Sequence, residues 1–291
     1  MDFLINTLEQ GFIFGIMALG VFITYSILDF PDLSVDGTFA LGAAVSASFL
    51  TKGINPWIVC LIALLYGLIG GLVTGIIHVK LKITNLLSGI LVMISLYSVN
   101  LRIMGKANVP LFNNKTIFSY DLSPILVISI LVISVKLLMD LFFKTKLGYM
   151  LKATGDNNQL VTSLGVSIGW CKILGLMLSN GLVALAGSIM AQYQRFSDIT
   201  MGNGTIVMGL AAIILGQSIF KKLTFAASTT VVIIGAILYK GSIALALRMG
   251  FPPTDLKLIT ALIVLAAIVT NNKNFSKSIK MLFSKGGNEV A

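Results

Sequence analysis

Long apolar runs dominate this chain, and short polar breaks separate them. A helix that crosses a bilayer needs about 20 mostly apolar residues, and in lipid every backbone polar group must be satisfied within its own segment. The runs lack a period-two alternation, which disfavours a β-barrel. The pattern therefore predicts an all-α polytopic membrane protein with nine apolar helices, at residues 7–28, 33–50, 56–77, 86–104, 122–143, 171–192, 204–220, 225–247 and 256–270.

Two of these runs leave the count open between eight and ten. The run at 33–50 is short and rich in Gly and Ala, and the run at 86–104 has polar residues at both ends. Each either spans the membrane or re-enters on the side from which it came. Some helices are therefore expected to be short or broken.

Lysine residues gather in every second break, which orients the chain if each run spans once. Cytoplasmic loops of membrane proteins carry an excess of Lys and Arg. The pattern predicts an N-terminus outside, a C-terminus in the cytoplasm, one transmembrane domain at 1–270 with a cytoplasmic loop at 144–170, and a basic cytoplasmic tail at 271–291. The lysines on the predicted cytoplasmic side are Lys80, Lys82, Lys144, Lys146, Lys152, Lys221, Lys222, Lys273, Lys277, Lys280 and Lys285.

Composition strengthens this picture. Only 11% of the residues are charged and 56% are hydrophobic, whereas soluble domains carry about 25% charged residues. The mean hydropathy is +0.96. The net charge of +10 suits loops facing an anionic membrane surface. Nucleic acid is not expected as a partner, because no basic stripe is interleaved with aromatic residues.

Two segments far apart in the chain resemble each other. Residues 32–38 read Asp-Leu-Ser-Val-Asp-Gly-Thr, and residues 198–205 read Asp-Ile-Thr-Met-Gly-Asn-Gly-Thr, with one residue inserted. Each opens a short Gly- and Ala-rich run, and the two runs are expected to cross in opposite directions. Inverted repeats with short, Gly-interrupted helices are typical of transporters. Chance similarity among Gly-rich membrane helices is the alternative.

The longest polar interruption, at 144–170, contains the sequence of a short helix. Asp156 or Asn157 is suited to cap its N-terminus, and Gly165 to close its C-terminus. Leu160, Val161 and Leu164 then share a face. Such a helix offers an apolar knob to another protein, and an ordinary connecting loop is the alternative.

Polar residues within or beside the apolar runs are candidates for a translocation path, because ionisable and polar groups in lipid are costly. Hydrogen bonding between helices is the alternative, and for the aspartate so is capping of a broken helix. The candidates are Asp36, Asn85, Ser88, Asn100 and Gln192.

Motifs of enzymes and metal sites are missing. The sequence has no Gly-x-x-x-x-Gly-Lys-Ser/Thr loop for ATP, no His-Glu-x-x-His pair and no Gly-x-Ser-x-Gly elbow. We therefore expect no catalytic residue, no metal and no cofactor in this chain. A transporter powered by another polypeptide fits best. An autonomous secondary carrier or channel is the alternative, and it needs an intramembrane ion relay for which few acids are present.

An ordered set of stretches resembles the permeases of bacterial ABC importers, in the branch that includes branched-chain amino-acid and ribose permeases. The chain is most similar to permeases linked to aromatic amino acids such as tryptophan or tyrosine. The stretches are Ile27-Leu-Asp-Phe-Pro-Asp-Leu-Ser-Val-Asp-Gly37, Asn85-Leu-Leu-Ser-Gly-Ile, Tyr97-Ser-Val-Asn-Leu-Arg-Ile-Met-Gly105, Ala191-Gln-Tyr-Gln and Asp255-Leu-Lys-Leu-Ile-Thr-Ala-Leu262.

The resemblance implies a homodimer in the bacterial plasma membrane, two ATP-binding subunits that hold ATP and Mg, and an extracellular substrate-binding lipoprotein. It implies import of a small polar solute, with an amino acid as the leading class. It also implies that the loop after the fifth helix couples the permease to the ATPase, although the Glu-Ala-Ala signature of other importers is absent. The residues so implied are Thr154, Gly155, Asp156, Asn157, Leu160, Leu164 and Gly165.

Overall fold

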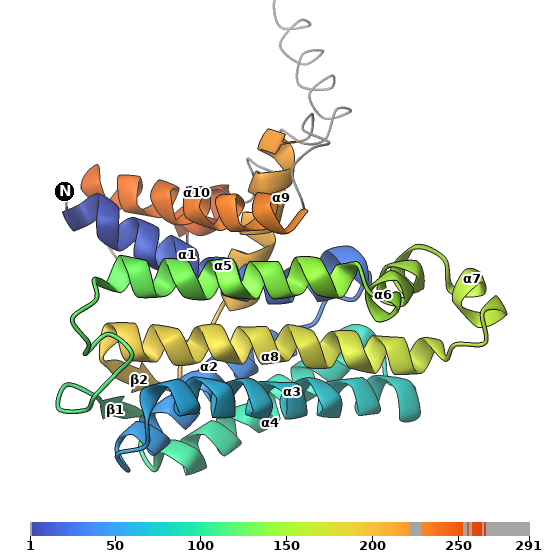
Figure 1. The fold of residues 1–291 in the computed structure, drawn as a ribbon, viewed down its shortest axis with the longest axis horizontal. Coiled ribbons are helices and arrows are strands. Elements are labelled where there is room, and N and C mark those ends of the chain that lie inside the picture. The colour runs from blue at the N-terminus through green and yellow to red at the C-terminus, as the bar shows by residue number, and fades with distance from the viewer. Residues whose placement is uncertain (1, 221–227, 253–254, 256–257, 264, 266–291) are drawn as a thin grey trace, which may run out of the picture.

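The structure, a computed structural model, describes residues 2–220, 228–252, 255, 258–263 and 265. It consists mainly of helices, with two very short strands (Figure 1). The elements are α1 (Asp2–Phe22), the π-helical turn η1 (Ile23–Ile27), α2 (Ser34–Leu50), α3 (Pro56–Lys80), α4 (Asn85–Met104), β1 (Asn108–Pro110), α5 (Pro124–Phe143), α6 (Lys146–Asp156), α7 (Asn158–Ser163), α8 (Ile168–Gln194), β2 (Phe196–Asp198), α9 (Thr205–Phe220) and α10 (Ser228–Arg248).

Six helices are long and apolar enough to cross a membrane: α1 with η1, α3, α4, α5, α8 and α10. Two shorter apolar helices, α2 and α9, accompany them. The prediction of a polytopic helical membrane protein is therefore confirmed, and eight of the nine predicted runs coincide with helices. Most of the ninth run, at 256–270, and the tail at 271–291 lie outside the described residues. The count of nine and the orientation remain predictions.

Helix α8 lies at the centre of the bundle, where it packs against α1, α2 and α3. Glycines set these close crossings, because a Cβ on Gly42 would overlap the carbonyl oxygen of Ala184, and one on Gly187 that of Phe39. Gly71 meets the carbonyl of Leu176 in the same way. Small residues permit this approach between helix backbones in lipid.

The two ends of the bundle differ (Figure 1). Helices α6 and α7 lie at one end, which we call the α7 end, and the two strands lie at the opposite strand end. Strands β1 and β2 pair antiparallel, with Val109 opposite Ser197. The expectation of an all-helical chain missed this small sheet, because three-residue strands leave no apolar pattern in the sequence. The sheet ties the loop after α4 to the loop after α8.

The short helices α2 and α9 begin near the middle of the bundle and run in opposite directions. Helix α2 runs toward the strand end. Its last residue, Leu50, accepts a hydrogen bond there from Asn114 in the loop that follows β1. Helix α9 instead runs toward the α7 end, where Gly216 packs against Val231 in the first turns of α10. Opposite directions are what an inverted repeat predicts.

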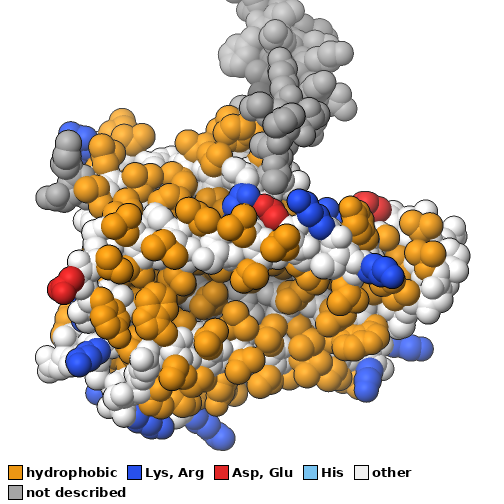
Figure 2. Space-filling view, viewed as in Figure 1, with side chains coloured by type: hydrophobic (Ala, Val, Ile, Leu, Met, Phe, Trp, Pro, Cys, Tyr) orange, Lys and Arg blue, Asp and Glu red, His pale blue; other side chains and the backbone are white. Residues whose placement is uncertain are grey.

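The outward surface of the bundle is largely apolar. Figure 2 shows hydrophobic side chains over the middle of one broad face, across α5, α8 and α3. The exposed side chains of α3 include Leu61, Leu65 and Ile69, each more than half exposed. A surface of this kind is suited to lipid rather than to water.

Candidate functional site

One carboxylate holds the beginnings of both short helices. Asp36 lies in the first turn of α2, yet its side chain reaches the start of α9. Its Oδ2 accepts from the Gly204 amide at 2.9 Å, and its Oδ1 accepts from the Thr205 hydroxyl and the Ile206 amide, both at 2.8 Å. Helix N-termini favour such acceptors, because their first N–H groups lack partners within the helix. Asp36 therefore caps α9, not its own helix.

The first aspartate of each repeat makes the same local contact. Asp32 Oδ1 accepts from the Ser34 amide at 2.8 Å, and Asp198 Oδ1 accepts from the Thr200 amide at 2.8 Å. The Thr200 hydroxyl also donates to Asp198, which is the main cause holding the pKa of this loop carboxyl below its usual value. The two segments thus share local geometry as well as sequence.

A buried polar cluster lies beside the start of α2. Asn180 of α8 donates to Asp32 Oδ2 at 2.8 Å and accepts from the hydroxyls of Thr38 at 2.7 Å and Ser34 at 3.2 Å. All four residues are buried. Asp32 and Asn180 carry the sequence signal that points to such a cluster, a polar side chain within or beside an apolar run.

A cavity of about 300 Å³ opens beside Asp36, between α2, α4 and the loop before α9. Asn100 is buried there, and its Nδ2 donates to the Gly37 carbonyl at 3.1 Å. Its Oδ1 finds no partner among the described residues. Two residues predicted for the path therefore meet at one cavity. The lining consists of Asp36, Gly37, Ala40, Met93, Ile94, Tyr97, Ser98, Asn100, Ile199 and Asn203.

The other three predicted path residues lie apart from this cavity. Asn85 begins α4 near the α7 end, and buried Ser88 donates to its backbone carbonyl at 2.8 Å. Gln192, near the other end of α8, accepts from the Ile117 amide at 3.1 Å and donates to the sulfur of Cys60. The bonds of Gln192 join separate segments, which is the helix-packing role weighed as the alternative, whereas the Ser88 bond stays within α4.

At the α7 end, the polar loop forms two helices rather than one. Asn157 ends α6 and caps α7, accepting from the amides of Gln159 at 3.0 Å and Leu160 at 3.2 Å. Gly165 has a φ of +74°, a conformation that closes helices and favours glycine. The predicted short helix, its cap and its closing glycine are therefore present. Leu160 and Leu164 are exposed, whereas Val161 is buried.

Helix α6 packs directly on the turn that leads into α2. A Cβ on Gly155 would overlap the carbonyl oxygen of Ile27, the last residue of η1. Thr154 is buried, and its hydroxyl donates to the Met150 carbonyl at 2.8 Å. Glycine at 155 thus brings the backbones of α6 and η1 into contact.

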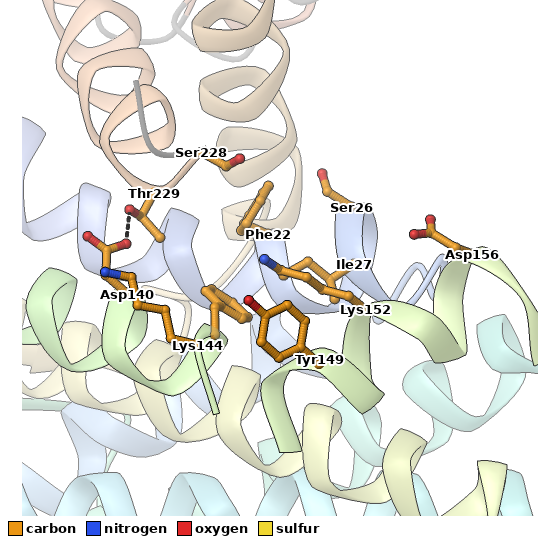
Figure 3. Close-up of a pocket in the computed structure, with 11 residues that line it drawn as sticks. Phe22, Ser26, Ile27, Asp140, Lys144, Tyr149, Lys152, Asp156, Ser228 and Thr229 are labelled. Atoms are coloured by element: carbon orange, nitrogen blue, oxygen red, sulfur yellow. Dashed lines mark hydrogen bonds between the residues drawn. The ribbon is translucent and has the colours of Figure 1, made fainter. Parts of the chain in front are cut away.

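A larger cavity of about 530 Å³ lies against the same helix. Figure 3 shows Tyr149 and Lys152 extending from α6 into it, with Asp156 at its edge. On its other side Asp140 of α5 accepts from the Thr229 hydroxyl and from Lys136. The cavity borders α1, η1, α5, α6 and the start of α10, so its shape depends on where α6 sits.

Lys240, a cation within an apolar run, is not among the candidates predicted from the sequence. Lys240 of α10 places its ammonium 3.6 Å from the centre of the Phe14 ring on α1. Cation–π contacts of this kind are favourable, more so when desolvated. The signal in the sequence is a single Lys inside an apolar run, which is also typical of a residue whose head group snorkels to the interface.

Apolar spanning helices, two opposed short helices that meet at a carboxylate, and a capped helix pair at one end together define a membrane transport protein of several spans. The family of branched-chain amino acid transport system permease components matches residues 3–269. The chain belongs to this family. It is a multi-pass plasma-membrane permease of the ABC transporter type.

Individual relatives agree with the family. A tyrosine transport system permease protein of Clostridioides difficile is 54% identical over 276 residues, covering 95% of this chain and 94% of that protein. The ribose import permease of Escherichia coli is 26% identical, covering 93% and 85%. PsaBC from Streptococcus pneumoniae in complex with Fab matches in fold, with a TM-score of 0.56, 16% identity, and coverage of 92% of this chain and 91% of that one.

Proposed function

We propose that this chain forms the homodimeric permease of an ABC importer that moves an amino acid into the cell by alternating access. Two separate ATPase subunits bind ATP and Mg, and an extracellular binding protein delivers the solute. The family match supports the class. The relative named for tyrosine transport, which is 54% identical over nearly the whole chain, supports an aromatic amino acid as the solute.

The α6–α7 pair is the proposed contact with the ATPase. Two leucines, Leu160 and Leu164, are exposed on a helix that is capped at one end and closed at the other. Residues four positions apart lie on one face of a helix, so these two leucines form a small apolar surface that is suited to a protein partner. Thr154, Gly155, Asp156, Asn157 and Gly165 hold these leucines in place in this proposal.

The contact between α6 and η1 carries the coupling argument. Because Gly155 brings α6 against the Ile27 carbonyl, a displacement of α6 is transmitted to the turn that precedes α2. Helix α2 begins the polar junction at Asp36. A motor attached at the α7 end therefore acts on the short helices through one backbone contact. This end is cytoplasmic in the proposal, as the lysine pattern predicts.

Asp36 and Asn100 are the proposed path residues, because they share a cavity near the middle of the bundle. Asn85, Ser88 and Gln192 were predicted with them, but lie elsewhere. The bonds of Gln192 to Ile117 and Cys60 support a packing role for that residue.

Leu164→Asp tests the coupling surface. The charge on an apolar contact should abolish ATP-driven uptake of tyrosine in proteoliposomes holding permease, ATPase and binding protein, because the ATPase no longer docks. Membrane insertion and monodispersity of the variant should be unchanged, since the side chain is 62% exposed. Leu81→Asp is the matched control, because Leu81 is 64% exposed at the same end of the bundle but outside α6 and α7.

Normal uptake with Leu164→Asp would overturn the coupling assignment. Uptake by the purified chain alone, in liposomes with a proton or sodium gradient and no ATPase, would overturn the importer and show an autonomous secondary carrier.

A further inference from the structure

Helix α4 is unlike its neighbours on its outward face. Ser95, Tyr97 and Ser98 are exposed near its middle, among exposed apolar residues such as Leu91 and Ile94. The exposed residues at comparable depth on α3 are apolar apart from Tyr66. Polar side chains in spanning helices avoid lipid and face the protein interior or water. The part of α4 that carries these hydroxyl groups is therefore suited to a wetted space or to the second protomer.

Behind this face lies the 300 Å³ cavity, and its lining is rich in acceptors. It contains the Asp36 carboxylate, the unpartnered Oδ1 of Asn100 and the side chain of Asn203. No Lys or Arg is among its lining residues. Asn100 is 1% exposed. A buried amide oxygen without a partner costs about 1–3 kcal/mol. We therefore expect a ligand to donate a hydrogen bond to the Asn100 Oδ1.

The apolar part of the lining limits what fits. Met93, Ile94 and Ile199 form the walls, and the Tyr97 ring stands at the mouth. Small-molecule sites combine such apolar walls with a few polar groups that fix orientation. A volume of about 300 Å³ is at the small end of their range.

We propose that this cavity is a subsite for the ammonium group of a zwitterionic amino acid, with Asp36 and Asn100 as acceptors and Tyr97 beside the solute side chain. This inference rests on the proposed function, since it concerns the solute that the importer moves. An ammonium carries three donors and no acceptor, which matches a carboxylate and a free amide oxygen. Asp36 keeps its bonds to α9 while the solute is bound, so the subsite sits on the junction between the short helices.

Thiol labelling of Ser98→Cys in membranes tests the charge preference. A cationic trimethylammonium methanethiosulfonate should react about tenfold faster than an anionic sulfonate analogue, because a cleft lined by one sign of charge concentrates counter-ions. Leu61→Cys is the control, because it lies at a similar depth. Leu61 is five residues from the end of α3 at the strand end, and Ser98 is six residues from the end of α4 there. The native cysteines Cys60 and Cys171 are buried, so the unmodified chain supplies the blank.

Two further variants separate charge from structure. Asp36→Asn in the Ser98→Cys background should remove the cationic preference. Thr205→Val removes one bond to Asp36 but leaves the carboxylate, and should keep the preference. Should Asp36→Asn fail to insert, Asn100→Leu serves instead, and should abolish protection by the solute.

Protection identifies the group that is recognised. Millimolar tyrosine should slow labelling of Ser98→Cys severalfold, and its deaminated analogue, 3-(4-hydroxyphenyl)propionate, should not. Equal protection by both compounds, faster labelling by the anionic reagent, or labelling no faster than at Leu61→Cys would each overturn the subsite. Labelling needs neither ATPase nor binding protein. Its outcome can therefore be interpreted even if the coupled uptake assay fails.

Discussion

Asn180 shows how one side chain organises the interior. Its amide donates to the carboxylate of Asp32 and accepts from Ser34 and Thr38, so it joins the central helix α8 to the loop and first turns of α2. A carboxylate in this position is tolerable only while its donors remain, because burying an unpaired charge is costly. Asn180 is therefore expected to set the place where α2 begins.

Asn180→Leu should destabilise the folded protein by about 2–3 kcal/mol, because it leaves Oδ2 of the buried Asp32 carboxylate without its donor while Oδ1 keeps the Ser34 amide. In detergent this corresponds to a fall of several degrees in the unfolding temperature, measured by intrinsic fluorescence. The neighbouring Ser179→Ala is the matched control, since the buried Ser179 hydroxyl has no partner among the described residues. Equal effects of the two substitutions would argue against the cluster as a stabilising unit.

Among the elements, the close approach of α2 to α8 matters most. Glycines on both helices create it: Gly42 meets the backbone of Ala184, and Gly187 that of Phe39. Without a hydrophobic driving force between helices in lipid, packing of this kind is what holds them together. The same approach brings Asn180 within reach of Asp32.

Gly42→Ala should therefore destabilise the protein by about 1–3 kcal/mol, the usual cost of an overpacked contact. Gly241→Ala is the control, because a Cβ at Gly241 in α10 meets nothing within 4 Å. There the gain in helix propensity, up to about 1 kcal/mol, should leave stability unchanged or raised. An unchanged unfolding temperature for Gly42→Ala in the same assay would mean that α2 can move away from α8 without loss of stability.

Much of the element pattern could be predicted from the sequence, because each helix needs only its own residues to satisfy its backbone in lipid. The cap at Asn157 and the closing conformation of Gly165 are local in the same sense, and the residue types predict them. Asp36 is different. It bonds to residues 168 to 170 positions away, and only the packing of α2, α8 and α9 brings these groups together. For the same reason sequence analysis could gather Asp36 and Asn100 as candidates, but could not separate them from Gln192.

At the scale of the whole molecule, the faces of the bundle are unequal. The outward face of α3 is apolar apart from Tyr66, whereas that of α4 mixes apolar residues with three exposed hydroxyl groups beside the cavity at Asp36. In the proposed homodimer, we expect α4 to face the second copy and α3 to face lipid. The two helices lie on adjacent parts of one chain, so their surroundings must change over a short distance.

Brominated lipids measure this difference directly, since they quench tryptophan on contact. With Trp57 and Trp170 replaced by Phe, Leu65→Trp on α3 should be strongly quenched and Tyr97→Trp on α4 only weakly. Both positions are more than half exposed in the single chain, so exposure alone predicts equal quenching. Strong quenching at both would place α4 against lipid.

The junction at Asp36 also bears on the history of the chain. Aligning the two repeats with Asn203 as the inserted residue places Gly202 opposite Asp36. A Cβ on Gly202 would overlap the Asp36 carbonyl oxygen, so the second copy has no room for its own aspartate. If the two segments descend from one ancestral sequence, this position must have diverged, because the junction admits the aspartate in only one copy.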